Sequence, residues 1–306
     1  MLLVTGITGH SGRWFLNELI QNKYQGDIRC IVREFSVTRE LLASGLNVQL
    51  AVGDLNDSDF VERAMSGVDQ VMHIYNIHHS PLILRMAMNC KVKRVILVHT
   101  TGIYSKFKHA SDGYKKIEEE IKELANSEGC PTKVTILRPT MIYGDLCDRN
   151  MSKFIRFVDR FRLVPIIDGG QSLLQPVNAR DLGKAFYAVL NRVETVNEEF
   201  DLSGHSPIQM LDVYKLISSE LGKRTVFINI PLSLGVFAAK MLRAVSLSKI
   251  DIVEKVQRMG ENRSYSHQKA KDAFGYQPMS FEDGIHIEVQ QYLDARTRIR
   301  GAGTTK

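Results

Sequence analysis

Three glycines near the start of the chain have the spacing of a phosphate-binding turn. Gly6, Gly9 and Gly12 follow an apolar run at residues 2–4 and precede a helical pattern that starts near Trp14. In such a strand–turn–helix unit, glycines permit a tight turn and let a pyrophosphate approach the backbone, while the helix start supplies free N–H groups. The pattern therefore predicts a dinucleotide site made by Gly6, Thr8, Gly9, His10, Ser11 and Gly12.

A cation stands where an acidic residue would bind the adenosine ribose of NAD. Arg33 ends the second predicted strand, 21 positions after Gly12. An acidic residue at about 20 positions accepts ribose hydrogen bonds, whereas a guanidinium can bind a 2′-phosphate in a fork. We therefore expect NADP to be preferred to NAD. The alternative is that Arg33 is a solvated strand end and the neighbouring Glu34 binds the ribose of NAD.

Asp54 and Leu55 follow the third predicted strand, where an adenine amino group would lie. The Asp54 carboxylate could accept a hydrogen bond from that group, and both residues are predicted to contact the cofactor. An aspartate here could equally cap the next helix, because a helical pattern begins soon afterwards.

A parallel sheet is needed to bring these residues together. Strand and helix patterns alternate as far as Gly144, and helices of this length between strands imply right-handed crossovers. The expected fold is α/β, a Rossmann-type doubly wound parallel sheet. The predicted strands are residues 2–4, 28–32, 46–52, 68–75, 94–99 and 133–138.

The regular alternation stops near Gly144, which predicts a second part of the chain. Residues 1–144 and 175–200 are expected to form an NAD(P)-binding Rossmann domain, with a strand near 175–177. Residues 145–174 and 201–295 would form a smaller, mostly helical substrate-binding cap, and residues 296–306 a flexible tail. The cleft between the two domains is the expected substrate site. The apolar stretch 231–245 is expected to be a buried cap helix rather than a helix on a membrane surface.

Composition fits a cytoplasmic protein that acts on a small molecule. The 306 residues are 44% apolar and 24% charged, and no apolar run reaches the ~18 residues of a membrane span. The first strand begins too early for a signal peptide. The net charge of +6 is mild, so no nucleic-acid partner is predicted; a homodimer is a possible assembly. No metal site is expected, because the adjacent His78 and His79 have no acidic or thiol partner near in sequence.

Several segments together resemble a known superfamily. They are Thr5–Gly12, Gly53-Asp-Leu55, His99-Thr-Thr-Gly-Ile-Tyr104, Leu137-Arg-Pro-Thr-Met-Ile-Tyr-Gly144, Gln175–Leu182 and Gly275-Tyr-Gln-Pro278. Over most of its length the chain is similar to extended or atypical short-chain dehydrogenases/reductases, and within them to the NAD-dependent epimerase/dehydratase family of sugar-nucleotide enzymes. The resemblance implies an NAD(P)-dependent oxidoreductase or epimerase acting on a nucleotide sugar or a similar hydroxyl or carbonyl substrate. It also implies that the nicotinamide is flanked by Tyr75, Asn76, Pro139, Thr140, Met141 and Ile142.

The catalytic pattern of that family is only partly present. The family uses a Ser or Thr with a Tyr-x-x-x-Lys pair on one helix, in which the lysine favours the ionised tyrosine. Thr100 matches the first position, although it could instead bond only to backbone at a strand end. Tyr114 is the candidate tyrosine, but four residues later stands Glu118, whose charge would raise the pKa of a tyrosine. Lys115 and Lys116 leave a helix at other angles, so one of them would need a distorted first turn to replace the lysine.

Other assignments stay open at this point. Tyr104 and Lys108 have the Tyr-x-x-x-Lys spacing but lie in a predicted loop, so the acid/base is Tyr114, Tyr104 or neither. Arg180 and Arg258 are candidates to bind a substrate diphosphate; the alternative is that they form ordinary ion pairs on the surface. The missing lysine favours a second function, a non-catalytic NADP-binding sensor or regulator. A reductase of a non-sugar carbonyl is a third.

Overall fold

The structure, a computed structural model, describes residues 1–33, 39–148, 150–246 and 251–303, without the side chains of 108–110 and 299–303. The chain forms two compact units. Unit 1 contains Met1–Thr140, Ala179–Leu202 and Ser266–Gln277, and unit 2 contains Met141–Asn178, Ser203–Tyr265 and Pro278–Lys306. Each unit has its own hydrophobic core.

Unit 1 is built on a seven-stranded sheet in the order β11-β6-β5-β4-β1-β2-β3, with every neighbouring pair parallel. The strand order reverses between β1 and β4, the point at which open α/β sheets bind ligands beyond the carboxyl ends of their strands. This confirms the predicted Rossmann-type fold. The strands are β1 (Leu2–Thr5), β2 (Ile28–Val32), β3 (Val48–Val52), β4 (Gln70–His73), β5 (Arg94–Val98), β6 (Lys133–Pro139) and β11 (Glu199–Leu202).

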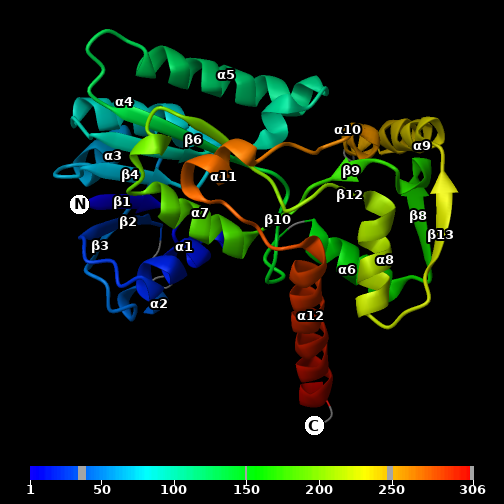
Figure 1. The fold of residues 1–306 in the computed structure, drawn as a ribbon. Helices are drawn as coiled ribbons and strands as arrows, with labels where there is room; N and C mark the ends of the chain where they lie inside the picture. Colours follow the sequence, from blue (N-terminus) through cyan, green and yellow to red (C-terminus); the bar gives the residue numbers. More distant parts are fainter. Residues whose placement is uncertain (34–38, 149, 247–250, 304–306) are drawn as a thin grey trace. The chain divides into compact units, whose positions relative to one another are not determined.

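Helices cover both faces of this sheet. Figure 1 shows α4 and α5 on one face and α1 with α7 on the other. Strand residues such as Leu3, Val71 and Val95 are completely buried beneath the helices, as expected for a parallel sheet covered on both sides. The helices of this unit are α1 (His10–Gln21), α2 (Arg39–Leu42), α3 (Ser58–Ala64), α4 (Ser80–Asn89), α5 (Lys108–Ala125), α7 (Ala179–Val189) and α11 (Gln268–Phe274).

The seventh strand is not the one predicted. The expected strand near residues 175–177 is β10 (Val177–Asn178), which pairs with β7 (Ile142–Tyr143) inside unit 2. The sheet is instead completed by β11, which pairs with β6. The sequence of β11, Glu-Phe-Asp-Leu, alternates acidic and apolar residues, so it lacks the continuous apolar run of a central parallel strand. As an edge strand it can carry such a pattern.

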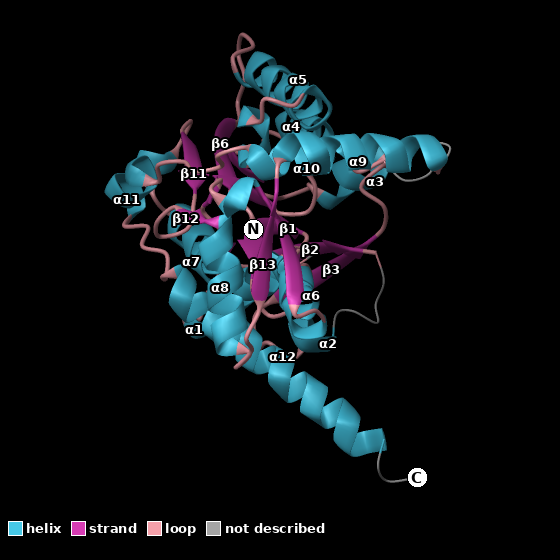
Figure 2. Ribbon diagram, turned by 90° about the vertical axis from the view of Figure 1, so that its right-hand side faces the viewer, coloured by secondary structure: helices cyan, strands magenta, loops and turns pink. Residues whose placement is uncertain are grey.

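Unit 2 contains five α-helices and three two-stranded sheets within the described residues (Figure 2). Its core includes Ile155, Val158, Val164, Val213 and Ile285. The helices are α6 (Met151–Arg160), α8 (Met210–Glu220), α9 (Leu232–Val245), α10 (Val253–Gln257) and α12 (Phe281–Gly303), and the remaining strands are β8 (Leu163–Ile167), β9 (Leu173–Leu174), β12 (Ile208–Gln209) and β13 (Val226–Ile230).

The units differ from the predicted domains at residues 141–144 and 175–178, which belong to unit 2, and at residues 201–202 and 266–277, which belong to unit 1. Helix α11 belongs to unit 1, because the Phe274 ring packs edge-on against Phe200 of β11 with ring centroids 5.3 Å apart. The segment from residue 296, expected to be a tail, continues α12 as far as Gly303, and Arg296 forms an ion pair with Asp159 at 2.7 Å. None of the helices in the described ranges is both long and apolar enough to span a bilayer.

Candidate functional site

The glycine turn lies at the carboxyl end of β1 and is closed too tightly for side chains. Gly6 has a φ of +78°, and the N–H of Gly9 donates to the Gly6 carbonyl at 2.9 Å. A Cβ placed on Gly12 would lie 2.0 Å from that same carbonyl oxygen. A Cβ on Gly6 would lie 2.8 Å from the backbone nitrogen of Tyr75, so the turn also touches the loop after β4.

Helix α1 presents an uncompensated amino end directly after this turn. Gly9 is the N-cap residue, no side chain caps the helix, and its first turn contains no acidic residue. The free N–H groups and the helix dipole therefore favour an anion at this end. The closed backbone cradle and the helix start together fit a dinucleotide pyrophosphate. Of the predicted contact residues, Ser11 is buried, while Thr8 and His10 are partly exposed.

A buried histidine that the sequence did not single out fixes the loop after β4. His73 is fully buried, and burial lowers its pKa to about 3. Its neutral ring accepts from the Thr5 hydroxyl at 2.7 Å and donates through Nε2 to the carbonyl of Asn76 at 2.9 Å. The histidine therefore ties the end of β1 to the Tyr75–Asn76 loop, which the family resemblance places near the nicotinamide.

Arg33 lies at the carboxyl end of β2 and is exposed. Its guanidinium carbon lies 5.8 Å from the ring centroid of Tyr75. Tyr75 is 45% exposed and its backbone adjoins Gly6, so Arg33, Tyr75 and the glycine turn share one end of the sheet. Glu34, the alternative ribose ligand, lies outside the described residues.

Asp54 organises the turn after β3 but does not cap the next helix. One carboxylate oxygen of Asp54 accepts from the backbone N–H and the side-chain amide of Asn56, both at 2.9 Å. Helix α3 is capped by Asp57, whose side chain accepts from the N–H of Phe60 at 3.0 Å. Leu55 packs in the core of unit 1, so only its backbone is available to a cofactor.

The structure brings Thr100 and Tyr114 together around Gly102. A Cβ placed on Gly102 would lie 3.2 Å from Cε2 of Tyr114 and 3.3 Å from the Thr100 hydroxyl oxygen. The Thr100 hydroxyl accepts from the N–H of Gly102 at 3.0 Å, so it also has the backbone role considered above. The Tyr114 hydroxyl has no hydrogen-bond partner within the described part of the chain.

Glu118 occupies the position of the family's lysine and is locked in a buried ion-pair network. It is 2% exposed and accepts from Arg138 through both oxygens, at 2.8 and 2.5 Å, and from Nδ1 of His99 at 3.0 Å. Burial alone would raise the pKa of Glu118, but the bonds from Arg138 and His99 hold it at about 2. Burial lowers the pKa of His99, whose neutral ring also accepts from Ser80 at 3.1 Å.

This network leaves Tyr114 without the cation that the family's mechanism uses. Helix α5 begins at Lys108, so Tyr114 lies in its second turn and no distorted first turn surrounds it. Lys115 and Lys116 are exposed. The sequence did contain a signal for the network: His99 and Arg138 are polar residues at the ends of two apolar strand patterns that neighbour each other in the sheet.

Tyr104 is engaged by an acidic side chain. Its hydroxyl donates to the Asp201 carboxylate at 3.1 and 3.2 Å. Burial and Asp201 raise the pKa of Tyr104 to about 12, although Arg138 acts in the opposite direction. A tyrosine held in this way is a poor general base. The side chain of Lys108, the other half of its Tyr-x-x-x-Lys spacing, lies outside the described residues.

The other predicted site residues are divided between the two units. Pro139 and Thr140 end unit 1, with the Pro139 carbonyl accepting from Thr101 at 3.3 Å, whereas Met141 and Ile142 begin unit 2. In unit 1, the Arg180 guanidinium packs 4.4 Å from the ring centroid of Trp14 on α1.

In unit 2, Nε of Arg258 forms an ion pair with Oε2 of Glu261 at 3.9 Å. Arg263 on the same segment is partly buried, and burial lowers its pKa.

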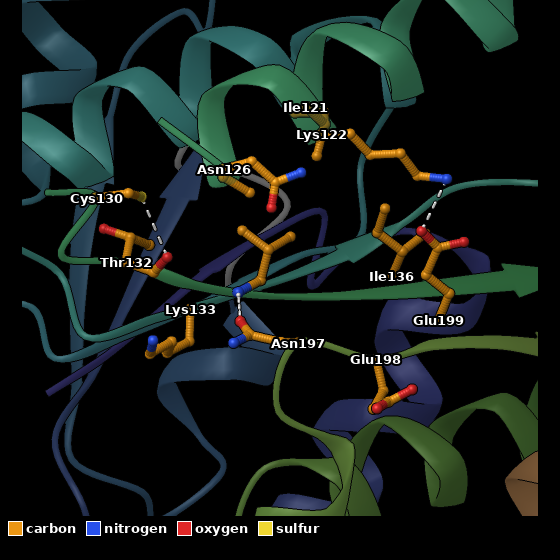
Figure 3. A pocket seen from close by; sticks show the side chains of 12 residues that line it. Ile121, Lys122, Asn126, Cys130, Thr132, Lys133, Ile136, Asn197, Glu198 and Glu199 are labelled. Carbon is orange, nitrogen blue, oxygen red and sulfur yellow. Dashed lines mark hydrogen bonds and ion pairs between the residues drawn. The ribbon is translucent and has the colours of Figure 1, made fainter. Parts of the chain in front are cut away.

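A pocket of about 280 Å³ lies elsewhere on unit 1, between the end of α5 and the starts of β6 and β11 (Figure 3). It contains none of the predicted site residues. Two interactions lie in its lining: Lys122 pairs with Glu199 at 3.0 Å, and the Asn197 side chain accepts from the N–H of Val134 at 3.1 Å. Glu199 also binds Arg138 at 2.5 Å, so this wall of the pocket adjoins the Glu118 network.

The parallel sheet and the closed glycine turn place the protein in the Rossmann-type α/β class. The chain belongs to the NmrA-like family, whose model matches residues 1–283. Its relatives support the resemblance seen in the sequence, because they include an epimerase and a dehydratase.

Three proteins to which the chain is similar are named for different reactions. The UDP-glucose 4-epimerase of Vibrio cholerae is 22% identical over 333 residues, covering 97% of each protein. A crystal structure of a dTDP-glucose 4,6-dehydratase from Streptomyces venezuelae with NAD bound has a TM-score of 0.74 at 18% identity, covering 97% of this chain and 98% of that one. An NADPH-dependent quinone oxidoreductase from Escherichia coli has a TM-score of 0.71 at 16% identity, covering 96% of this chain and 100% of that one.

Proposed function

We propose that this protein binds NADP(H) in preference to NAD(H). The glycine turn and the amino end of α1 would hold the pyrophosphate, and Arg33 would hold the adenosine 2′-phosphate. Asp54 and the backbone of Leu55 would lie at the adenine. Tyr75, Asn76 and the Pro139–Ile142 segment would lie at the nicotinamide. The tight glycine turn before the uncapped amino end of α1 supports the bound pyrophosphate, and the place of Arg33 beside Tyr75 carries the preference for NADP(H).

Titration of both cofactors tests the assignment of Arg33. We expect NADPH to bind at least about tenfold more tightly than NADH, since a charge-assisted hydrogen bond contributes about 1.5–3 kcal/mol. Arg33→Ala should remove this preference, whereas Arg39→Ala, at another exposed arginine of the same unit, should leave it intact. Equal affinities in the native protein would refute the assignment.

The function that the geometry supports best is a reductase that uses NADPH to reduce a small carbonyl or quinone. Bound nicotinamide would supply the hydride. The Thr100 hydroxyl and the Tyr114 ring both lie at Gly102, and the hydroxyls of these two residues would hydrogen-bond the substrate oxygen that receives the hydride. A neutral tyrosine can donate its proton in this direction. Epimerisation or dehydration of a sugar starts with removal of a hydroxyl proton, for which Glu118 supplies no activating cation.

Turnover measurements test this assignment. NADPH oxidation should be followed with quinones, small carbonyl compounds and, for the sugar-nucleotide alternative, UDP-glucose. Tyr114→Phe should lower kcat/KM by about 10²–10⁴ while NADPH affinity stays unchanged. Tyr104→Phe should change the rate much less, because its hydroxyl is held by Asp201. Turnover of UDP-glucose with loss of rate in Arg258→Ala would favour the nucleotide-sugar enzyme instead.

The Glu118 network also supports a second candidate, a sensor that binds NADP(H) without turnover. The Arg138 cation neutralises Glu118, which stands in the lysine position, and neutral His99 donates a hydrogen bond to it. A non-catalytic protein has no need of an activated tyrosine. NADPH binding without oxidation by any of these substrates, and with the same affinity in Tyr114→Phe, would favour the sensor.

A further inference from the structure

Helix α9 carries a row of large apolar side chains that face outward. The sequence predicted a buried cap helix here, but Ala239 is its only buried residue. Leu234, Phe237, Met241 and Val245 are 55%, 59%, 50% and 79% exposed. Their spacing of three, four and four residues places all four on one side of the helix. We call these four residues the α9 stripe.

The opposite side of α9 attaches the helix to unit 2. Ala239 is buried there, and a Cβ on Gly235 would lie 2.8 Å from Cδ1 of Ile167 in β8 and 3.3 Å from Val256 of α10. Figure 1 shows α9 at the carboxyl ends of β8 and β13. The helix therefore keeps a fixed orientation in its unit, and the stripe is the side left to the solvent in the described structure.

Charge indicates what could cover the stripe. Helix α9 contains two basic residues, Lys240 and Arg243, and no acidic one. Unit 2 contains 18 Lys and Arg against 13 Asp and Glu, whereas unit 1 contains 22 against 21. Of the net charge of +6, unit 2, which carries the stripe, therefore accounts for +5 and unit 1 for +1. Arg243 lies on the opposite side of the helix and pairs with Asp251 at 3.2 Å, so Lys240 is the basic residue of α9 at the edge of the stripe. Two copies packed stripe to stripe would bring their Lys240 side chains toward each other, which disfavours self-association.

We propose that the α9 stripe binds the surface of a bilayer that contains anionic lipids. The helix would lie in the plane of the interface, with the stripe at the boundary of the acyl chains and Lys240 among the headgroups. An outward apolar side that contains Phe and Leu and is bordered by a lysine is consistent with the composition of interfacial helices. With 14 residues the helix is too short to span the bilayer.

Vesicle co-sedimentation of the full chain tests the proposal. Vesicles of equal parts phosphatidylcholine and phosphatidylglycerol should sediment the protein, and vesicles of phosphatidylcholine alone should bind it much more weakly. Binding should fall as NaCl is raised, because headgroup attraction is screened. The double variant Phe237→Ser/Met241→Ser should bind anionic vesicles at least about tenfold more weakly.

Control variants distinguish binding through the α9 stripe from non-specific hydrophobic binding to vesicles. Val193→Ser removes an apolar side chain that is 81% exposed in unit 1, and it should bind vesicles like the native protein. The melting temperature of the double variant should match that of the native protein, because both substituted side chains are exposed. The proposal is overturned if anionic vesicles bind no protein, or bind the double variant equally. It is also overturned if light scattering shows a dimer that the double variant loses while vesicles bind neither form.

Discussion

At the scale of single residues, Glu118 has the largest expected effect on stability. Glu118→Gln would leave Arg138 as a buried cation with one partner fewer, and breaking a buried ion pair costs about 3–5 kcal/mol. Urea denaturation at pH 7 should measure this loss. The adjacent exposed Glu119→Gln should cost under about 0.5 kcal/mol.

The pH dependence of that loss follows from the lowered pKa of Glu118. The folded-state pKa of about 2 is below the ordinary glutamate pKa of 4.5, so the stabilisation is fully present above about pH 4.5. It disappears as the pH falls toward about 2. The difference in unfolding free energy between native protein and Glu118→Gln should therefore shrink below about pH 4.5. A difference that stays constant down to pH 3 would contradict the ion-pair assignment.

The contribution of Glu288 in α12 to stability should have the opposite dependence on pH. It is completely buried, and burial together with the Asp148 carboxylate raises its pKa to about 9. Because the folded-state pKa is raised, the native protein loses stability as the pH rises from about 4.5 to about 9. Glu288→Gln does not titrate, so at pH 7 it should be about 1–3 kcal/mol more stable than the native protein.

Thermal unfolding at pH 5 and pH 8 measures that difference for Glu288. The advantage of the variant should be larger at pH 8. Glu282→Gln, at an exposed position of the same helix, should show no such trend. A variant that is less stable than the native protein at both pH values would show that Glu288 is ionised in the folded state.

At the scale of elements, the close approach of β1 and α1 depends on Gly12. Gly12→Ala would place a Cβ 2.0 Å from the Gly6 carbonyl, so the turn must open. We expect NADPH affinity to fall more than about tenfold and stability to fall by about 1–3 kcal/mol. Isothermal titration measures the first effect. Gly113→Ala in α5 has no neighbour within 4 Å and should keep full affinity while gaining about 0.5–1 kcal/mol of stability.

Elements also show where sequence patterns are sufficient and where they are not. The strands through β6 were predictable because each is an apolar run between helical patterns, and the glycine turn because its spacing is local. Strand β11 was missed because Glu199 and Asp201 interrupt its apolar pattern. The orientation of α9 could not be predicted, because an apolar stripe has the same spacing whether it faces a core or the solvent.

Residues of the candidate site that depend on local sequence patterns were predictable, whereas those with distant partners were not. The positions of Gly12 and Arg33 follow from one strand and one turn. The meeting of His99, Glu118 and Arg138 depends on three elements, which the sequence alone does not place side by side. The role of His73 is equally non-local, since its partner Thr5 is 68 residues away.

At the scale of the whole molecule, the two separate cores predict an uneven response to cofactor. NADPH at about a hundred times its dissociation constant should add about 2.7 kcal/mol to the stability of the state that binds it. Hydrogen exchange should show most of the added protection in residues 1–140, which belong to unit 1. Protection of equal size in the β8 and β13 segment would contradict a cofactor site built on the unit 1 sheet. Gly12→Ala serves as the control and should show little added protection.

The Glu118 network has a consequence for how such a protein can change by mutation. Replacing Glu118 with lysine would set a second cationic group beside Arg138 in a site that is 2% exposed. Replacing Arg138 first would strand a buried carboxylate. Both single substitutions toward a Tyr-x-x-x-Lys pair therefore pass through a destabilised protein. Only a combination that keeps one cation and one carboxylate in the network avoids a buried, unbalanced charge, so this chain is separated from the catalytic form of the pair by at least two coupled substitutions.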